Sequence, residues 1–162
     1  MEKDIRQQYC KITKTLIERN ITVATMESCT GGLIASLITD TEGASGIFFG
    51  GMVTYSNEAK IKAGVLAETI DTYGVYSKET ATSMAKSCRK YYGTQIGIGV
   101  TGSLGNVDPV NGDSIPGEVY LAVVGEKELQ KKIILTEEEN RFSYKMQVAE
   151  EMGKMILESI KE

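Results

Sequence analysis

One stretch of the sequence constrains the fold more than any other: two apolar runs joined by a turn rich in Ser, Thr and Gly. The first run, residues 21–25, is rich in β-branched residues and predicts a strand, and the second, residues 33–38, suits a helix. Between them lie Ser28, Cys29 and Thr30, each a potential nucleophile, followed by two glycines that permit close backbone approach. Unpaired N–H groups at a helix start attract anions, so the turn is a candidate site. An ordinary N-capped helix after a strand would give the same pattern.

The composition limits the classes of partner. A chain of 162 residues predicts one domain, since this length buries about 70% of the unfolded surface. A formal net charge of −4 gives no electrostatic basis for binding nucleic acid. No apolar run reaches membrane-spanning length and the N-terminus carries no secretory signal. Three widely spaced cysteines form no disulfide framework, so we expect a reducing, cytoplasmic location.

The sequence contains no histidine, and this narrows the chemistry. The Ser-His-Asp and Cys-His classes of hydrolase are excluded. Most zinc sites are excluded too, because the three cysteines lack paired spacing. Any general base must therefore be Lys, Asp, Glu or Tyr.

Apolar periodicity predicts alternating helices and strands. Helices are predicted over residues 3–19, 33–39, 57–63, 66–73 and 77–93, and strands over 21–26, 46–55, 95–101, 119–124 and 129–135. A last helix is predicted behind a capping box of Thr136 and Glu139, with Phe142 on its buried face.

The order of these elements indicates the fold class. The strand over 119–124 is wholly apolar and predicts a central strand, and the strand over 46–55 is apolar on both faces. Helices separate the earlier strands, which indicates crossover connections, whereas the strands over 119–124 and 129–135 follow each other directly as a hairpin. The predicted fold class is therefore α/β, a mixed β-sheet with helices packed on its faces, in a single domain over 1–162.

Ser28 and Lys60 form the first candidate catalytic pair. A serine hydroxyl needs a base to take its proton, and without histidine a neutral lysine amine can do so. Burial lowers a lysine pKa toward neutrality. Lys60 lies one turn into the helix predicted over 57–63, so it could point back at that helix's start. A surface lysine is the more common role of this residue type.

Two further features are weaker candidates. Gly97 to Gly102 fits G-x-G-x-x-G, but these glycines lie inside a predicted strand and not at a helix start, which argues against a dinucleotide site. Thr101 and Gly102, at the carboxyl end of that strand, could still line a pocket. Cys29 fits a small buried apolar residue better than a nucleophile, because no imidazole is available to it. The long loop over 102–117 is predicted to be functional or mobile.

Three segments in this order resemble the C-terminal domain of the CinA family (competence/damage-inducible protein) in its stand-alone form. They are Glu-Ser-Cys-Thr-Gly-Gly at 27–32, Tyr-Ser-Asn-Glu-Ala-Lys at 55–60 and Gly-Val-Thr-Gly at 99–102. The resemblance covers about residues 4–160 and implies a mixed α/β sheet and homo-oligomers. It also implies hydrolysis of the carboxamide of nicotinamide mononucleotide to nicotinate mononucleotide and ammonia, without a metal or organic cofactor.

The resemblance assigns roles residue by residue. Ser28 matches the nucleophile and Lys60 the base, and Tyr55 belongs to the same catalytic block. The turn would present backbone N–H groups to an oxyanion or a phosphate, and an arginine at the start of the last helix is matched. The substrate-binding positions are Thr30, Gly31, Gly32, Ser45, Asn57, Thr101, Gly102 and Arg141. Lys145 stands where a second arginine is common.

One segment departs from the family pattern. The family's Ala-Gly-Pro-Asp-Gly-Gly loop is replaced by the unrelated run over 104–112, in which Gly105 and an Asp-like position survive. Two alternatives therefore stay open. The chain could be a catalytically silent module that binds a nucleotide or a partner, or an amidase for a different small amide.

Overall fold

The computed structural model describes residues 1–162, and its five strands form one sheet. The strands are β1 (Val23–Glu27), β2 (Phe48–Val53), β3 (Ile96–Gly102), β4 (Glu118–Val124) and β5 (Glu128–Ile134). Their order is β2-β1-β3-β4-β5. β1 runs parallel to β2 and β3, whereas β4 runs antiparallel to β3 and β5. The predicted mixed sheet is therefore confirmed, as is the hairpin of β4 and β5.

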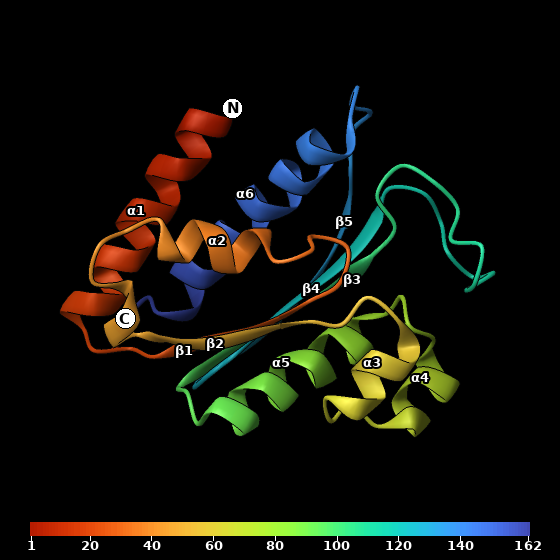
Figure 1. Ribbon diagram of the computed structural model, residues 1–162, viewed down its shortest axis with the longest axis horizontal. Helices are drawn as coiled ribbons and strands as arrows, with labels where there is room; N and C mark the ends of the chain where they lie inside the picture. The colour runs from red at the N-terminus through yellow and green to blue at the C-terminus, as the bar shows by residue number, and fades with distance from the viewer.

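Six α-helices and one short 3₁₀ helix complete the fold. They are α1 (Glu2–Glu18), α2 (Leu33–Thr39), η1 (Ala44–Gly46), α3 (Asn57–Lys62), α4 (Ala67–Tyr73), α5 (Lys78–Tyr92) and α6 (Arg141–Ser159). The helices α1, α2 and α6 cover one face of the sheet, and α3, α4 and α5 lie on the other (Figure 1). None of the helices is both long and apolar enough to cross a lipid bilayer.

Two glycines of β3 explain how closely α5 lies on the sheet. A Cβ atom on Gly97 would lie 1.9 Å from the carbonyl oxygen of Ala85, and one on Gly99 would lie 2.0 Å from that of Ala81. No side chain fits at either position. The glycines thus serve helix packing inside a strand, as the sequence predicts, and do not form a dinucleotide-binding turn.

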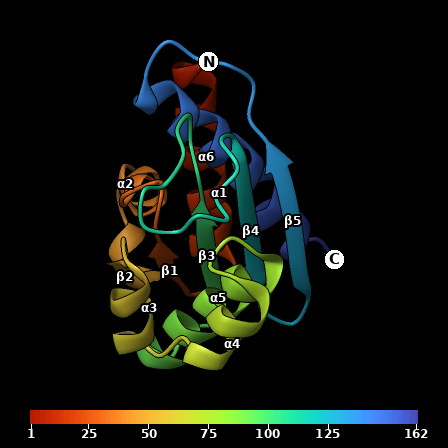
Figure 2. The ribbon, with the colours of Figure 1, turned by 90° about the vertical axis from the view of Figure 1, so that its right-hand side faces the viewer.

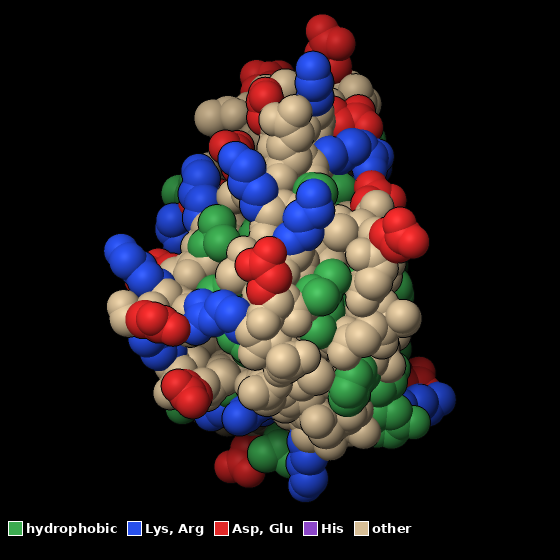
Figure 3. Space-filling model, turned by 90° about the vertical axis from the view of Figure 1, so that its left-hand side faces the viewer, with side chains coloured by type: hydrophobic (Ala, Val, Ile, Leu, Met, Phe, Trp, Pro, Cys, Tyr) green, Lys and Arg blue, Asp and Glu red, His purple; other side chains and the backbone are tan.

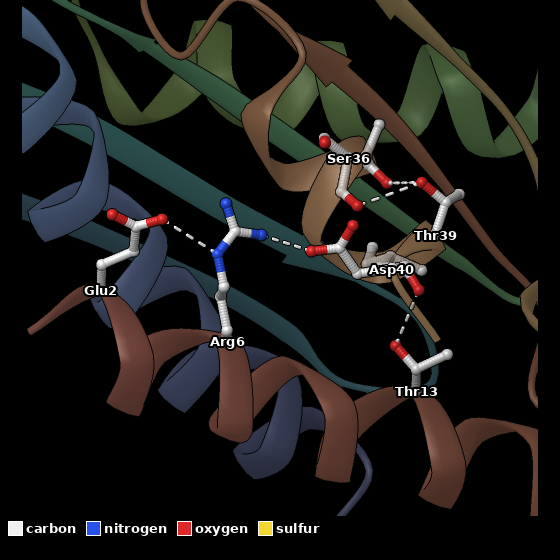
Figure 4. Close-up of polar contacts among 8 residues, drawn as sticks. Glu2, Arg6, Thr13, Ser36, Thr39 and Asp40 are labelled. Atoms are coloured by element: carbon white, nitrogen blue, oxygen red, sulfur yellow. Dashed lines mark hydrogen bonds and ion pairs between the residues drawn. The ribbon is translucent and has the colours of Figure 1, made fainter. Parts of the chain in front are cut away.

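Polar contacts hold α2 against α1 on the other face (Figure 4). Arg6 of α1 forms ion pairs with Glu2 and with Asp40, the residue that follows α2. The Thr13 hydroxyl donates to the carbonyl oxygen of Ile38 at 3.1 Å. These contacts fix the carboxyl end of α2, the helix that begins directly after the Ser- and Gly-rich turn.

Two expectations about burial are wrong in part. β2 is apolar on both faces, as the sequence indicates, but it is an edge strand, and its residues alternate between half-buried and exposed. Phe49 is 50% exposed and Val53 is 54% exposed. Phe142 on the last helix is 45% exposed and does not join the core. Phe49 and Val53 lie on the outer edge of the sheet, and Phe142 lies at the start of a helix. Nothing in this chain covers these places.

The predicted capping box is also wrong. The N-cap of α6 is Asn140, whose side-chain oxygen accepts a hydrogen bond from the N–H of Ser143 at 2.9 Å. Thr136 instead bonds through its N–H to the side chain of Gln147 at 3.0 Å. Asparagine is as good an N-cap as threonine, and it lies directly before the helical residues.

The end of the molecule remote from the loop after β3 has a mixed surface. Lys and Arg side chains are interspersed there with Asp and Glu (Figure 3). This face therefore offers no extended field of one sign that would favour a polyanion.

Candidate functional site

Ser28 is the first residue beyond β1, at the carboxyl end of a parallel strand. Its N–H donates to the carbonyl oxygen of Val100 in β3 at 3.0 Å, which ties the turn to the sheet. Gly31 and Gly32 then adopt positive φ angles of 60° and 98°. This left-handed backbone favours glycine and lets α2 begin at once. The turn over residues 28–32 thus keeps Ser28 in a fixed position.

The buried carboxylate of Glu27 fills the start of α2. Glu27 is 1% exposed and accepts hydrogen bonds from the Thr30 hydroxyl at 2.7 Å and from the N–H groups of Ile34 at 2.9 Å and Ala35 at 3.1 Å. Burial raises the pKa of this carboxyl group, and the hydrogen bonds oppose that rise. The start of α2 is therefore occupied by a carboxylate. The signal in the sequence was a single acidic residue at the end of an apolar strand.

This arrangement corrects the expected anion donors. The N–H of Gly31 donates to the carbonyl oxygen of Ser28 at 2.9 Å. The backbone of Gly32 faces the Glu27 carboxylate and lowers its pKa. The N–H groups of Cys29 and Thr30 donate to no other backbone group. Cys29 lines the cavity described below and Thr30 does not, so the N–H of Cys29 replaces the glycine N–H groups as the candidate donor to an anion.

Lys60 reaches Ser28 from α3. The Ser56 hydroxyl caps this helix by accepting from the N–H of Ala59 at 3.0 Å, which places Lys60 on the first turn. Lys60 is 2% exposed. Its Nζ lies 2.8 Å from the carbonyl oxygen of Thr54 and 3.2 Å from the Oγ of Ser28. The structure thus brings together the two side chains that the sequence pairs, although their chemical roles stay a prediction.

The surroundings of Lys60 favour its neutral form. Burial lowers the pKa of the amine from 10.5 to about 8, against the opposing effects of Cys29 and Asp108. No carboxylate forms an ion pair with it. A neutral amine at this distance can accept the proton of the Ser28 hydroxyl.

Cys29 is not a second nucleophile. Its side chain is buried, and burial raises the pKa of the thiol to about 12. A thiol with that pKa stays protonated at neutral pH, and only the thiolate is reactive. The burial expected of a small packing residue is therefore confirmed for Cys29, and its lack of a catalytic role stays a prediction.

A cavity of about 290 Å³ opens beside Ser28. It is lined by Ser28, Cys29, Tyr55, Tyr76, Gly102, Ser103, Leu104, Asn106, Asp108, Pro109, Val110 and Arg141. Much of its wall is the loop between β3 and β4, which extends beyond the end of the sheet (Figure 1). The loop over 102–117 is therefore a wall of the candidate site, and ligands of α/β sheets prefer this end of the strands.

Arg141 joins the rim of the cavity. It is the first residue of α6, and its guanidinium donates to Asn106 Oδ1 at 2.6 Å and to the Tyr55 hydroxyl at 3.3 Å. Asn57 lies nearby but does not line the cavity, because its side chain donates to Asn111 Oδ1 at 2.9 Å. Asn57 therefore ties α3 to the loop.

Two predicted binding residues lie elsewhere in this chain. Ser45 is exposed in η1, which precedes β2 and so lies at the opposite end of the parallel strands from Ser28. Thr101 is buried, and its hydroxyl donates to the carbonyl oxygen of Val75 at 3.0 Å. Within one chain, neither side chain reaches the cavity, whereas Gly102 does.

Asp108 is a wall residue that the sequence reasoning missed. Its Oδ2 accepts from the Tyr76 hydroxyl and from Asn111 Nδ2 at 2.9 Å, and its Oδ1 accepts from the N–H of Val110 at 2.8 Å. These bonds hold the pKa of the carboxyl group down to about 2. The signal was an Asp-Pro pair in the loop, which is typical of a turn and carries no periodic pattern.

The structure contains no group of three His, Cys, Asp or Glu side chains that could hold a metal ion. The cavity wall itself offers the hydroxyl of Ser28, the phenol groups of Tyr55 and Tyr76 and the charged side chains of Asp108 and Arg141.

A sequence model of the CinA C-terminal domain matches residues 6–160. The chain belongs to the CinA C-terminal domain family. A competence-damage inducible protein of Acetivibrio thermocellus is 49% identical over 111 residues, which is 68% of this chain and 27% of that protein. A CinA-like protein of Kosmotoga olearia is 41% identical over 134 residues, 80% of this chain and 32% of that protein. The chain thus spans about a third or less of the length of these curated relatives.

Solved structures share the fold. The competence/damage inducible protein CihA from Agrobacterium tumefaciens superposes with a TM-score of 0.87 at 28% identity, covering 98% of this chain and 96% of that chain. A CinA superfamily protein from Escherichia coli superposes with a TM-score of 0.86 at 21% identity, covering 96% and 90%. The second likeness concerns the fold alone.

Proposed function

We propose that this CinA domain hydrolyses the carboxamide of nicotinamide mononucleotide to nicotinate mononucleotide and ammonia, a step of pyridine nucleotide salvage. The observation that carries the proposal is the buried contact of 3.2 Å between Lys60 Nζ and Ser28 Oγ beside a small-molecule cavity. A hydroxyl paired with an amine of lowered pKa is an arrangement suited to acyl transfer. The family resemblance supplies the substrate.

The proposed reaction has two halves. The neutral amine of Lys60 takes the proton of Ser28 Oγ as this oxygen attacks the carboxamide carbon. The resulting ammonium gives the proton to the departing nitrogen, which leaves as ammonia and yields an acyl ester on Ser28. Water then attacks the ester, with Lys60 accepting its proton and returning it to Ser28 Oγ, so that the carboxylate is released and the enzyme is restored.

Backbone N–H groups would stabilise the oxyanion of each tetrahedral intermediate. Among these groups, the N–H of Cys29 lies next to the nucleophile on the cavity wall and donates to no other backbone group. Such a donor contributes about 3 kcal/mol to transition-state stabilisation. At the rim, the guanidinium of Arg141 keeps unused N–H donors for the phosphate, and the Tyr55 hydroxyl lies beside it.

Ammonia release from nicotinamide mononucleotide tests the proposal. We expect Ser28→Ala and Lys60→Ala each to lower kcat by about 10³-fold or more. Lys62→Ala is the matched control, because Lys62 lies on the same helix but is exposed and paired with Glu58. Full activity of Lys60→Ala would contradict the assignment of the base.

A second candidate is a silent module that binds a nucleotide or a protein without turnover. The observation in its favour is that the divergent loop is tied to α6 by the Arg141–Asn106 hydrogen bond and to α3 by the Asn57–Asn111 hydrogen bond. Calorimetry would then show saturable binding with no ammonia released. Release of ammonia from other small carboxamides, but not from nicotinamide mononucleotide, would instead indicate an amidase of different specificity.

Self-association and a cytoplasmic location stay predictions. Light scattering of the purified protein and fractionation of the source cells would test them.

A further inference from the structure

The cavity wall carries two charged side chains of opposite sign, Asp108 and Arg141. Arg141 bonds to two neutral groups, Asn106 and the Tyr55 hydroxyl. Asp108 likewise bonds only to neutral donors, and no Lys or Arg forms an ion pair with it. The cavity therefore presents one negative and one positive charge that the protein itself does not neutralise.

The Asp108 carboxylate is held in place before any ligand binds. Its own N–H donates to the Ser114 hydroxyl at 2.7 Å, while Val110 closes a turn on Oδ1. The Tyr76 hydroxyl and Asn111 bind Oδ2 from the other side. Neutral donors stabilise a carboxylate as an anion without cancelling its charge, so its field persists in the cavity.

We infer that Asp108 makes this cavity selective for carboxamides whose ring is a permanent cation, such as an N-alkylated pyridinium, over those with an uncharged ring. The inference rests on the proposed function and names the residue that recognises the ring. A quaternary ring nitrogen has no N–H, so hydrogen bonds cannot recognise it and an opposing charge can. Arg141 at the rim takes the anionic group of the same ligand, which makes the site complementary to a zwitterion.

The pKa of Lys60 gives a second reason for a cationic ring in the ligand. Burial lowers the pKa of its amine, and the Asp108 carboxylate acts in the opposite direction. A bound ring cation would offset the effect of Asp108 and keep the amine neutral. The charge of the ligand would thus help both its binding and the base that acts on it.

Calorimetry with two matched ligands tests the inference. Nicotinamide mononucleotide has a cationic ring, and its 1,4-dihydro form has the same carboxamide, ribose and phosphate on an uncharged ring. Both are titrated into Ser28→Ala, which prevents turnover. We expect this protein to bind the cationic ligand about tenfold more tightly. Adding Asp108→Asn should remove that preference, because the affinity for the cationic ligand should fall by more than the affinity for the dihydro ligand.

The loop that contains Asp108 also offers a matched control variant. Asp113→Asn removes one negative charge from an exposed residue of the loop that does not line the cavity, and the preference should persist. An equal loss of affinity for both ligands in Asp108→Asn would show a structural role and overturn the inference. So would equal affinities in the parent protein, or no binding of either ligand.

The test separates the inference from the proposed function. If the wild-type chain binds the cationic ligand selectively through Asp108 but releases no ammonia, the proposed function fails and the inference stands. If it releases ammonia from both ligands with equal kcat/KM, the proposed function stands and the inference fails.

Discussion

A buried lysine without a carboxylate partner is costly, and Lys60 is such a residue. Its ammonium form donates to the Thr54 carbonyl and the Ser28 hydroxyl, which are both uncharged. Groups whose pKa is shifted by burial inside a cleft are candidates for catalysis. Here the shift has a use, because the base must lose its proton near physiological pH before it can act on Ser28.

The pH dependence of activity follows from the pKa of Lys60. Only the neutral amine can accept the Ser28 proton, so kcat/KM should rise with pH around pH 8. Asp108→Asn should move this rise to lower pH, since it removes a carboxylate that raises the pKa of the amine. Initial rates of ammonia release between about pH 6 and about pH 10 measure both. A profile that is flat across this range would contradict Lys60 as the base.

At the scale of elements, the contact of β3 with α5 sets the distance between sheet and helix. A side chain at either glycine of β3 would collide with a backbone carbonyl of α5, which cannot rotate away. The N-terminal end of α5 directly follows the segment that contributes Tyr76 to the cavity. A shift of this helix would therefore reach the site.

Substitution of these glycines should destabilise the fold strongly. Gly97→Ala and Gly99→Ala place a Cβ 1.9 and 2.0 Å from carbonyl oxygens, so the helix must move away. We expect each to cost roughly 3 kcal/mol or more of unfolding free energy. Gly46→Ala is the control, since nothing lies within 4 Å of its added Cβ. Urea denaturation measures all three, and similar midpoints for the three variants would refute the packing argument.

The elements were predictable because their signals are local. The bare face made by Gly97 and Gly99 could be seen in the sequence, as could the apolar run of β4. The N-cap of α6 could not, because Thr136 and Asn140 are both capping residues and the choice depends on where β5 ends. The exposure of Phe49 depends on the order of strands, which local periodicity does not contain.

The catalytic pair of the site was predictable from residue chemistry and from the family resemblance, whereas its wall was not. Ser28 and Lys60 are 32 residues apart, and their contact depends on the crossover from β1 to β2. Asp108 lies in a loop without periodicity, so no sequence pattern predicts that it lies on the cavity wall. Ser45 matched the family pattern, but the parallel direction of β2 places it at the far end of the sheet. The positions of these residues relative to Ser28 depend on the topology of the chain, which local sequence patterns predict poorly.

At the scale of the whole molecule, the site is assembled at one end of the sheet. It draws on the turn after β1, the segment after β2, the loop after β3 and the start of α6 (Figure 2). Residues far apart in the chain meet there because β1, β2 and β3 are parallel and end together. Folding therefore brings an amine out of water, and the stability of the entire chain depends on the protonation of that amine.

This dependence predicts how stability changes with pH. The pKa of Lys60 is about 8 in the folded chain and 10.5 when solvated, so between these values the unfolded chain binds more protons. Unfolding free energy should then rise with pH across this window, by about 3 kcal/mol at most. Lys60→Met has no such group, and the hydrogen bond it loses to the Thr54 carbonyl costs the same at every pH. Denaturation of both proteins at about pH 7 and about pH 10.5 measures this effect. The wild type should gain stability relative to the variant at the higher pH. A constant difference between the two proteins would mean that the pKa of the Lys60 amine is not shifted in the folded chain.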